Sequence, residues 1–91
     1  MTYQAALMQL GFVKESQMVY ALHTDKGRHI KVDSSCHMIS FFDNIAPCEL
    51  RQYRLTKSSG TVPSIIKALA KEGFSPLGRR LNRLMKGGVI L

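Results

Sequence analysis

The sequence predicts an α+β domain in which a small antiparallel sheet of three to four strands carries helices on one face. The chain has 91 residues, of which 45% are hydrophobic and 21% charged, so it can bury one core and not two. Several segments between residues 17 and 56 alternate apolar and polar positions, as strands do, whereas the flanking segments have helical spacing. The expected order is α-β-β-β-(β)-α-α within a single compact domain, residues 1–91.

A first helix is expected from about residue 3 to residue 10. Thr2 can cap its start, and Gly11 suits the left-handed position that follows a helix, with Phe12 folding back as a hydrophobic partner. The apolar face of this helix consists of Tyr3, Ala6, Leu7 and Leu10.

A hairpin follows, because residues 17–23 and 28–33 both alternate. If Asp25, Lys26 and Gly27 form a three-residue turn with Gly27 at positive φ, the apolar positions of the two strands face each other. This register pairs Leu22 with Ile30 and Tyr20 with Val32.

A third strand is predicted from about His37 to Phe42, with Ile39 and Phe41 on the apolar face. Residues 50–56 alternate as well and can form a fourth strand, although one amphipathic helical turn fits the same residues.

Two helices complete the chain. Thr61 is predicted to cap the first, which ends at Gly73, and Ser75 to cap the second, with Pro76 in its first turn. Gly87 and Gly88 would stop the second helix, and the apolar residues 89–91 would join the sheet or the core. The two buried stripes are Val62, Ile65, Ile66 and Leu69, then Leu77, Leu81, Leu84 and Met85.

The charge of the chain is one-sided. Residues 51–91 hold nine basic residues and one acid, whereas residues 1–50 hold four basic residues and five acids, so the net charge of +7 comes from the second part. Such asymmetry indicates an anionic partner and says little about fold.

On the last two helices the basic residues form like-charged pairs at i, i+4, Lys67 with Lys71 and Arg79 with Arg83. Each such pair costs a few tenths of a kcal/mol, so we interpret the stripes as a binding surface, with a merely solvated face as the alternative. Arginine suits phosphate or carboxylate. The candidate binding residues are Arg51, Arg54, Lys67, Lys71, Arg79, Arg80, Arg83 and Lys86.

No catalytic residue, metal site or cofactor is predicted. His23 and His29 fall opposite each other on the face of the hairpin away from the core. We expect both side chains to face solvent, with a metal site or a histidine-based nuclease as the alternative. The spacing of Cys36 and Cys48 fits neither a disulfide framework nor a zinc site. We found none of the common nucleotide-binding or hydrolase motifs.

Three resemblances follow from these features. The length, single-domain build and missing catalytic motif resemble small phage-encoded anti-CRISPR proteins, which implies a non-enzymatic protein that blocks a nucleic-acid-handling complex. Residues 62–91, with the Gly73 turn and the basic run Arg79-Arg80-Leu81-Asn82-Arg83-Leu84, resemble a winged-helix segment. The α-β-β-β-α order with Gly60-Thr61 opening a helix is similar to toxin ribonucleases of the HicA kind, but their Gly-Ser-His context is absent here.

The sequence therefore predicts a basic, non-enzymatic protein that binds nucleic acid or a nucleoprotein complex with an acidic or RNA surface. The favoured role is inhibition of a host nucleic-acid defence system by a phage or mobile element, through blocked RNA, DNA or subunit contacts. The alternatives are a winged-helix transcriptional regulator and a toxin ribonuclease. No membrane segment or secretory signal is recognised, so a cytoplasmic location is expected, in the bacterial host if the protein is phage-encoded.

Overall fold

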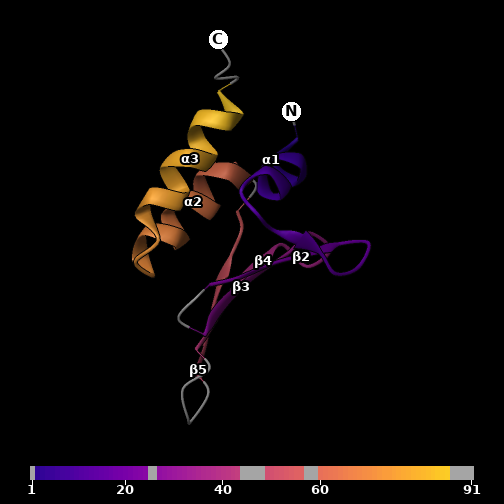
Figure 1. Cartoon of the computed structure of the whole chain (residues 1–91), viewed down its shortest axis with the longest axis vertical. Helices are drawn as coiled ribbons and strands as arrows, with labels where there is room; N and C mark the ends of the chain where they lie inside the picture. The colour runs from indigo at the N-terminus through magenta and orange to yellow at the C-terminus, as the bar shows by residue number, and fades with distance from the viewer. Residues whose placement is uncertain (1, 25–26, 44–48, 57–59, 87–91) are drawn as a thin grey trace.

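The structure, a computed structural model, describes residues 2–24, 27–43, 49–56 and 60–86. It confirms the α+β class, with three helices and one antiparallel sheet (Figure 1). In chain order the elements are α1 (Tyr3–Gln9), β1 (Val13–Lys14), β2 (Val19–His23), β3 (Arg28–Asp33), β4 (Met38–Asp43), β5 (Glu49–Arg54), α2 (Thr61–Lys71) and α3 (Ser75–Met85).

The sheet is a meander whose spatial order, β1-β2-β3-β4-β5, equals its order in the chain. The optional fourth strand of the sequence prediction is confirmed as β5, which pairs with β4 over its whole length. The additional strand, β1, has only two residues, Val13 and Lys14, which pair with Ala21 and Tyr20. Two residues are too few to show an alternation, so sequence patterning could not have found this strand.

The predicted hairpin register is confirmed. Leu22 lies opposite Ile30 and Tyr20 opposite Val32. Gly27 has φ 77°, the left-handed conformation that the three-residue turn requires, and its amide donates to the carbonyl of Thr24 at 3.3 Å. The register therefore places Tyr20, Leu22, Ile30 and Val32 on one face, while Val19 and Ala21 of β2 lie on the other.

That face carries the core, and the helices lie together against it (Figure 1). Ile30, Val32, Ile39 and Phe41 are at most 1% exposed, and they face fully buried side chains from each helix. The helix residues are Leu7 of α1, Ile65 and Leu69 of α2, and Leu81 of α3. The opposite face of the sheet carries no helix within the described part of the chain, so the domain has two layers.

The ends of α1 and α2 use the same cap. The amide of Phe12 donates to the carbonyl of Leu7 at 3.0 Å, and the amide of Phe74 donates to that of Leu69 at 2.7 Å. In both cases a glycine at positive φ, Gly11 or Gly73, precedes the phenylalanine, as a helix ending in a left-handed residue requires.

The predicted N-caps are right for one helix and wrong for two. The side chain of Thr2 accepts from the amide of Ala5 at 3.2 Å, as expected. For α2 the cap position is Gly60 and Thr61 is the first helical residue, while for α3 the cap position is Phe74 and Ser75 is the first helical residue. Neither of these caps is closed by a side-chain hydrogen bond, because a glycine and a phenylalanine offer no acceptor there.

Cys36 is an exposed free thiol. The predictions for Cys48, for the glycine pair 87–88 and for residues 89–91 lie outside the described residues. Among the helices that the structure describes, none has the length and apolar character needed to cross a membrane.

Candidate anion-binding surfaces

The structure distributes the eight predicted binding residues over three places. Arg51 lies in a network of ion pairs between the sheet and α2. Arg54, Lys67 and Lys71 line a groove between β5 and α2. The other four residues, Arg79, Arg80, Arg83 and Lys86, are exposed on α3 and its C-terminal cap.

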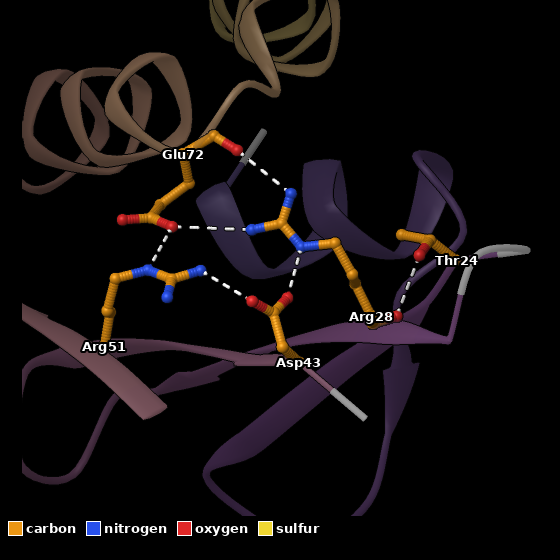
Figure 2. Close-up of polar contacts among 5 residues, drawn as sticks. All are labelled: Thr24, Arg28, Asp43, Arg51 and Glu72. Carbon is orange, nitrogen blue, oxygen red and sulfur yellow. Dashed lines mark hydrogen bonds and ion pairs between the residues drawn. The ribbon is translucent and has the colours of Figure 1, made fainter. Parts of the chain in front are cut away.

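Arg51 belongs to a network of two arginines and two carboxylates, shown in Figure 2. Arg28 Nε donates to Asp43 Oδ1 at 2.7 Å, and its terminal nitrogens reach the backbone carbonyl of Glu72 at 3.2 Å and its Oε1 at 3.4 Å. Arg51 Nε donates to the same Oε1 at 2.6 Å, and its Nη2 to Asp43 Oδ2 at 3.1 Å. The Tyr53 hydroxyl donates to the other carboxylate oxygen, Glu72 Oε2.

The sheet register assembles this network. Arg28 pairs with Asp43 across β3 and β4, and both residues share the helix-covered face with Ile30 and Phe41. Arg51 lies opposite Phe41 on β5, and Glu72, at the C-terminal cap of α2, completes the group. The side chain of Glu72 is only 6% exposed, so its charge is compensated by direct partners rather than by water.

The carboxylates of the network are held ionised. The Arg51 guanidinium lowers the pKa of Asp43, aided by Arg28 against the opposing effect of burial. Burial raises the pKa of Glu72, but its bonds from Tyr53 and Arg51 and the charge of Arg28 outweigh burial, so the pKa lies below its ordinary value. The pKa of Arg51 is raised by its bonds to Glu72 and Asp43. Asp43, Glu72 and Arg51 are therefore charged at neutral pH, and the network holds the end of α2 against the sheet.

Four acids on the described part of the chain have partners that lie away from the outer faces of α2 and α3. Glu72 and Asp43 belong to the network, Glu15 pairs with Lys31 at 3.3 Å, and Asp33 accepts from the backbone amide of Ser35 at 2.9 Å. The side chain of Glu49 is not among those described. Consequently, the basic residues of α2 and α3 form no ion pair with any described acid.

A groove of about 420 Å³ runs between β5 and α2. Ser64, near the start of α2, bonds to Thr56 just after β5, and Glu72, at the end of α2, bonds to Arg51 of β5. The helix α2 therefore runs antiparallel to β5. Lys71 Nζ lies 5.6 Å from the centre of the Tyr53 ring, a cation–π distance. The groove is lined by Tyr53, Arg54, Thr56, Pro63, Ser64, Lys67, Ala68 and Lys71, with no acid among them.

Two smaller depressions flank α3. One, of about 230 Å³, lies between α1 and α3, where Arg80 and Arg83 stand beside Gln9, Leu10 and Leu84. The other, of about 360 Å³, lies along α3 itself. Its lining consists of Arg79, Asn82, Arg83 and Lys86. Arg83 borders both depressions and is the central cation of this surface, which we call the α3 face: Arg79, Arg80, Arg83 and Lys86.

The histidine pair predicted on the open face of the sheet is confirmed. His23 and His29 lie opposite each other with ring centres 5.1 Å apart. Phe42 is the cross-strand neighbour of His29, and its ring stacks at 4.5 Å. His29 Nδ1 is buried with no hydrogen-bond partner among the described residues. Burial, aided by the charges of His23 and Lys31, lowers the pKa of His29, so its ring stays neutral at neutral pH.

Comparisons with models of protein families, with curated proteins and with solved structures found no match to this chain. Sequence reasoning missed Arg28, Asp43 and Glu72 as a group and the groove beside β5. The alternation of side chains along a strand could have identified Arg28 and Asp43, because they occupy the same alternating positions as the core residues of β3 and β4.

Proposed function

We propose that this protein binds the phosphate backbone of nucleic acid through the α3 face and acts by binding rather than by catalysis. The observation that carries the proposal is the composition of that face. Its four basic side chains are exposed, and none pairs with an acid among the described residues. A helix that needed charge only for solubility would be stabilised by neighbouring residues of opposite charge, whereas α3 carries like charges at neighbouring positions.

The spacing of the cations favours nucleic acid over a protein partner. Arg79 and Lys86 are separated by about 10 Å along a helix axis, and Arg80 and Arg83 lie between them. Duplex nucleic acid presents one negative charge per about 1.7 Å of axis, a density that suits four cations in so short a distance. Three of the four are arginines, whose planar fork can donate two parallel hydrogen bonds to one phosphate.

Base readout has little support on this face. Asn82 is the one amide side chain that lines the depression along α3. Gln52, the other residue suited to base edges, lies on the sheet, where its amide donates to Ser40 Oγ at 3.3 Å. We therefore expect binding with little sequence preference, since phosphate contacts fix position and carry no sequence information directly.

The biological role that we propose is to block a nucleic-acid-handling complex, as an inhibitor encoded by a phage or a mobile element. Its support is the one-sided charge: a protein that covers phosphates makes them inaccessible to another protein. A DNA-binding regulator of the winged-helix type would instead need to discriminate among duplex sequences, which provides a way to separate the two roles.

The test is fluorescence anisotropy with short labelled RNA and DNA, single-stranded and duplex, in several sequences. The wild type should bind with similar affinity across sequences, and the triple variant Arg79→Glu, Arg80→Glu, Arg83→Glu should not bind. Lys14→Glu is the control, because Lys14 is an exposed base on β1. Circular dichroism checks that each variant is folded. Unchanged binding by a folded triple variant would overturn the proposal, and a strong preference for one duplex sequence would favour the regulator.

A further inference from the structure

The two edges of the sheet differ in length. β1 has two residues, whereas β5 has six, from Glu49 to Arg54, and it is the last strand of the sheet within the described residues. A strand at an edge presents unpaired amide and carbonyl groups to any chain that can lie beside it. The β5 edge is thus the longer available template for another strand.

The direction of the backbone groups along β5 follows from two hydrogen bonds. The amide of Leu55 donates inward to the carbonyl of His37 at 2.8 Å, and that of Thr56 donates outward to Ser64 Oγ of α2 at 3.2 Å. Because inward and outward groups alternate along a strand, the amides and carbonyls of Gln52 and Arg54 point outward. Their side chains are exposed, on the face of the sheet away from the helices.

The outer edge of β5 opens into the groove beside α2. The groove brings Arg54 of β5 together with Lys67 and Lys71 of α2, and no acid lines it. Thr56 and Ser64 also line it, and their hydroxyl oxygens are 2.9 Å apart. A chain lying along β5 would therefore have a backbone template on one side and two lysines on the other.

We propose that this groove binds an extended, acidic segment of a partner protein, which adds to β5 as a sixth, antiparallel strand. Main-chain hydrogen bonds to Gln52 and Arg54 would supply affinity, and acidic side chains facing Lys67 and Lys71 would supply specificity. A second copy of this chain is disfavoured, because pairing two β5 edges would bring their basic residues together. The site lies outside the α3 face, so this proposal goes beyond the nucleic-acid function and does not depend on it.

The geometry specifies how such a segment must be patterned. In an antiparallel addition, the residues that bond to Gln52 and Arg54 have their side chains on the open face of the sheet. The intervening residues point toward α2, where Lys67 and Lys71 lie. A peptide of alternating valine and glutamate satisfies both requirements, with the glutamates toward α2 and the valine amides bonded to β5.

The test measures the binding of three labelled peptides to the full chain by fluorescence anisotropy. The peptides are alternating Val-Glu, the same peptide N-methylated at every valine, and the same peptide N-methylated at every glutamate. Methylation at valine should weaken binding by tenfold or more, since about two hydrogen bonds of roughly 0.7 kcal/mol each would be lost. Methylation at glutamate should leave binding unchanged. Charge is identical in all three peptides, so equal binding by all of them would overturn the proposal, as would no binding by the unmodified peptide.

The protein variants separate this site from the α3 face. Lys67→Glu with Lys71→Glu should abolish peptide binding and leave RNA binding by the α3 face in place, whereas the triple arginine variant should do the reverse. Circular dichroism confirms that both are folded. Loss of RNA binding in the lysine variant, with peptide binding retained, would make the groove a nucleic-acid contact and refute the peptide site. Failure of the triple variant to affect RNA would count against the nucleic-acid function alone.

Discussion

The guanidinium of Arg28 contacts both the side chain and the backbone carbonyl of Glu72, which lies 44 positions further along the chain. The contact joins the beginning of β3 to the C-terminal cap of α2. Besides neutralising a carboxylate, Arg28 places a positive charge at the end of a helix, where unsatisfied carbonyls carry partial negative charge. Arg51 and Asp43 extend the contact across the sheet. The helix that bears Lys67 and Lys71 is fixed in place by this group.

We expect Glu72→Gln to lower the free energy of unfolding by about 2–3 kcal/mol, because hydrogen bonds to a charged group are stronger than neutral ones and both arginines lose a counter-charge. Glu15→Gln is the control. Glu15 also pairs with a base, Lys31, but its side chain is 37% exposed, and surface pairs contribute at most about 1 kcal/mol. Urea denaturation of the two variants measures both values. Equal losses would show that the network does not stabilise the fold more than a surface pair does.

The same residue should govern stability in acid. The pKa of Glu72 is lower in the folded protein than its ordinary value of 4.5, so the unfolded chain binds protons more readily. Its stabilising contribution is therefore complete above pH 4.5 and is lost as the pH falls through the folded pKa. Denaturation at about pH 7 and about pH 3 should show a smaller loss of stability for Glu72→Gln than for the wild type. Parallel losses in the two proteins would contradict this assignment.

His29 should produce a separate dependence at milder pH. Its pKa is lower in the folded state than the ordinary 6.5, so its contribution to stability is complete above pH 6.5 and decreases as the pH falls toward the folded pKa. The carboxylates of the network stay ionised in this range. Denaturation at about pH 7.5 and about pH 5.5 should show the decrease in the wild type, and His29→Gln should reduce it. A dependence that persists unchanged in His29→Gln would refute the assignment to His29.

Nucleic-acid binding should weaken steeply with salt. Four phosphate contacts from the α3 face would give a slope of log K against log salt of about −3 to −4, because each contact releases condensed counterions. Arg83→Glu should make this slope shallower by about 1 or more, whereas Lys14→Glu, with the same change in charge, should leave it unchanged. Titrations at several salt concentrations provide the slopes. If both variants alter the slope equally, net charge rather than the α3 face accounts for binding.

The fold class and the register of the β2–β3 hairpin could be predicted from the sequence because the underlying patterns are local. The alternation in residues 17–23 and 28–33, with Gly27 between them, determines which residues face each other. The two phenylalanine caps also follow from short motifs. The two-residue strand β1 could not be predicted in this way. Val13 and Lys14 are extended because they pair with β2, and they have no alternating pattern of their own.

The candidate surfaces were only partly predictable, for a different physical reason. The basic stripes of α2 and α3 follow from helical periodicity alone. Whether a given arginine is available for a partner depends on distant residues, however, and Arg51 is engaged by Asp43 and Glu72 in the folded protein. The groove beside β5 depends on how α2 returns along the strand, which no local pattern specifies.

The meander order of the sheet also has a consequence for the folding pathway. Each strand pairs with its neighbour in the chain, so the sheet can grow hairpin by hairpin with short loops to close. The packing of α1 against α3 and the contact between Arg28 and Glu72 instead join distant segments and should form late. Substitutions at Leu10 or Glu72 should then accelerate unfolding far more than they slow folding.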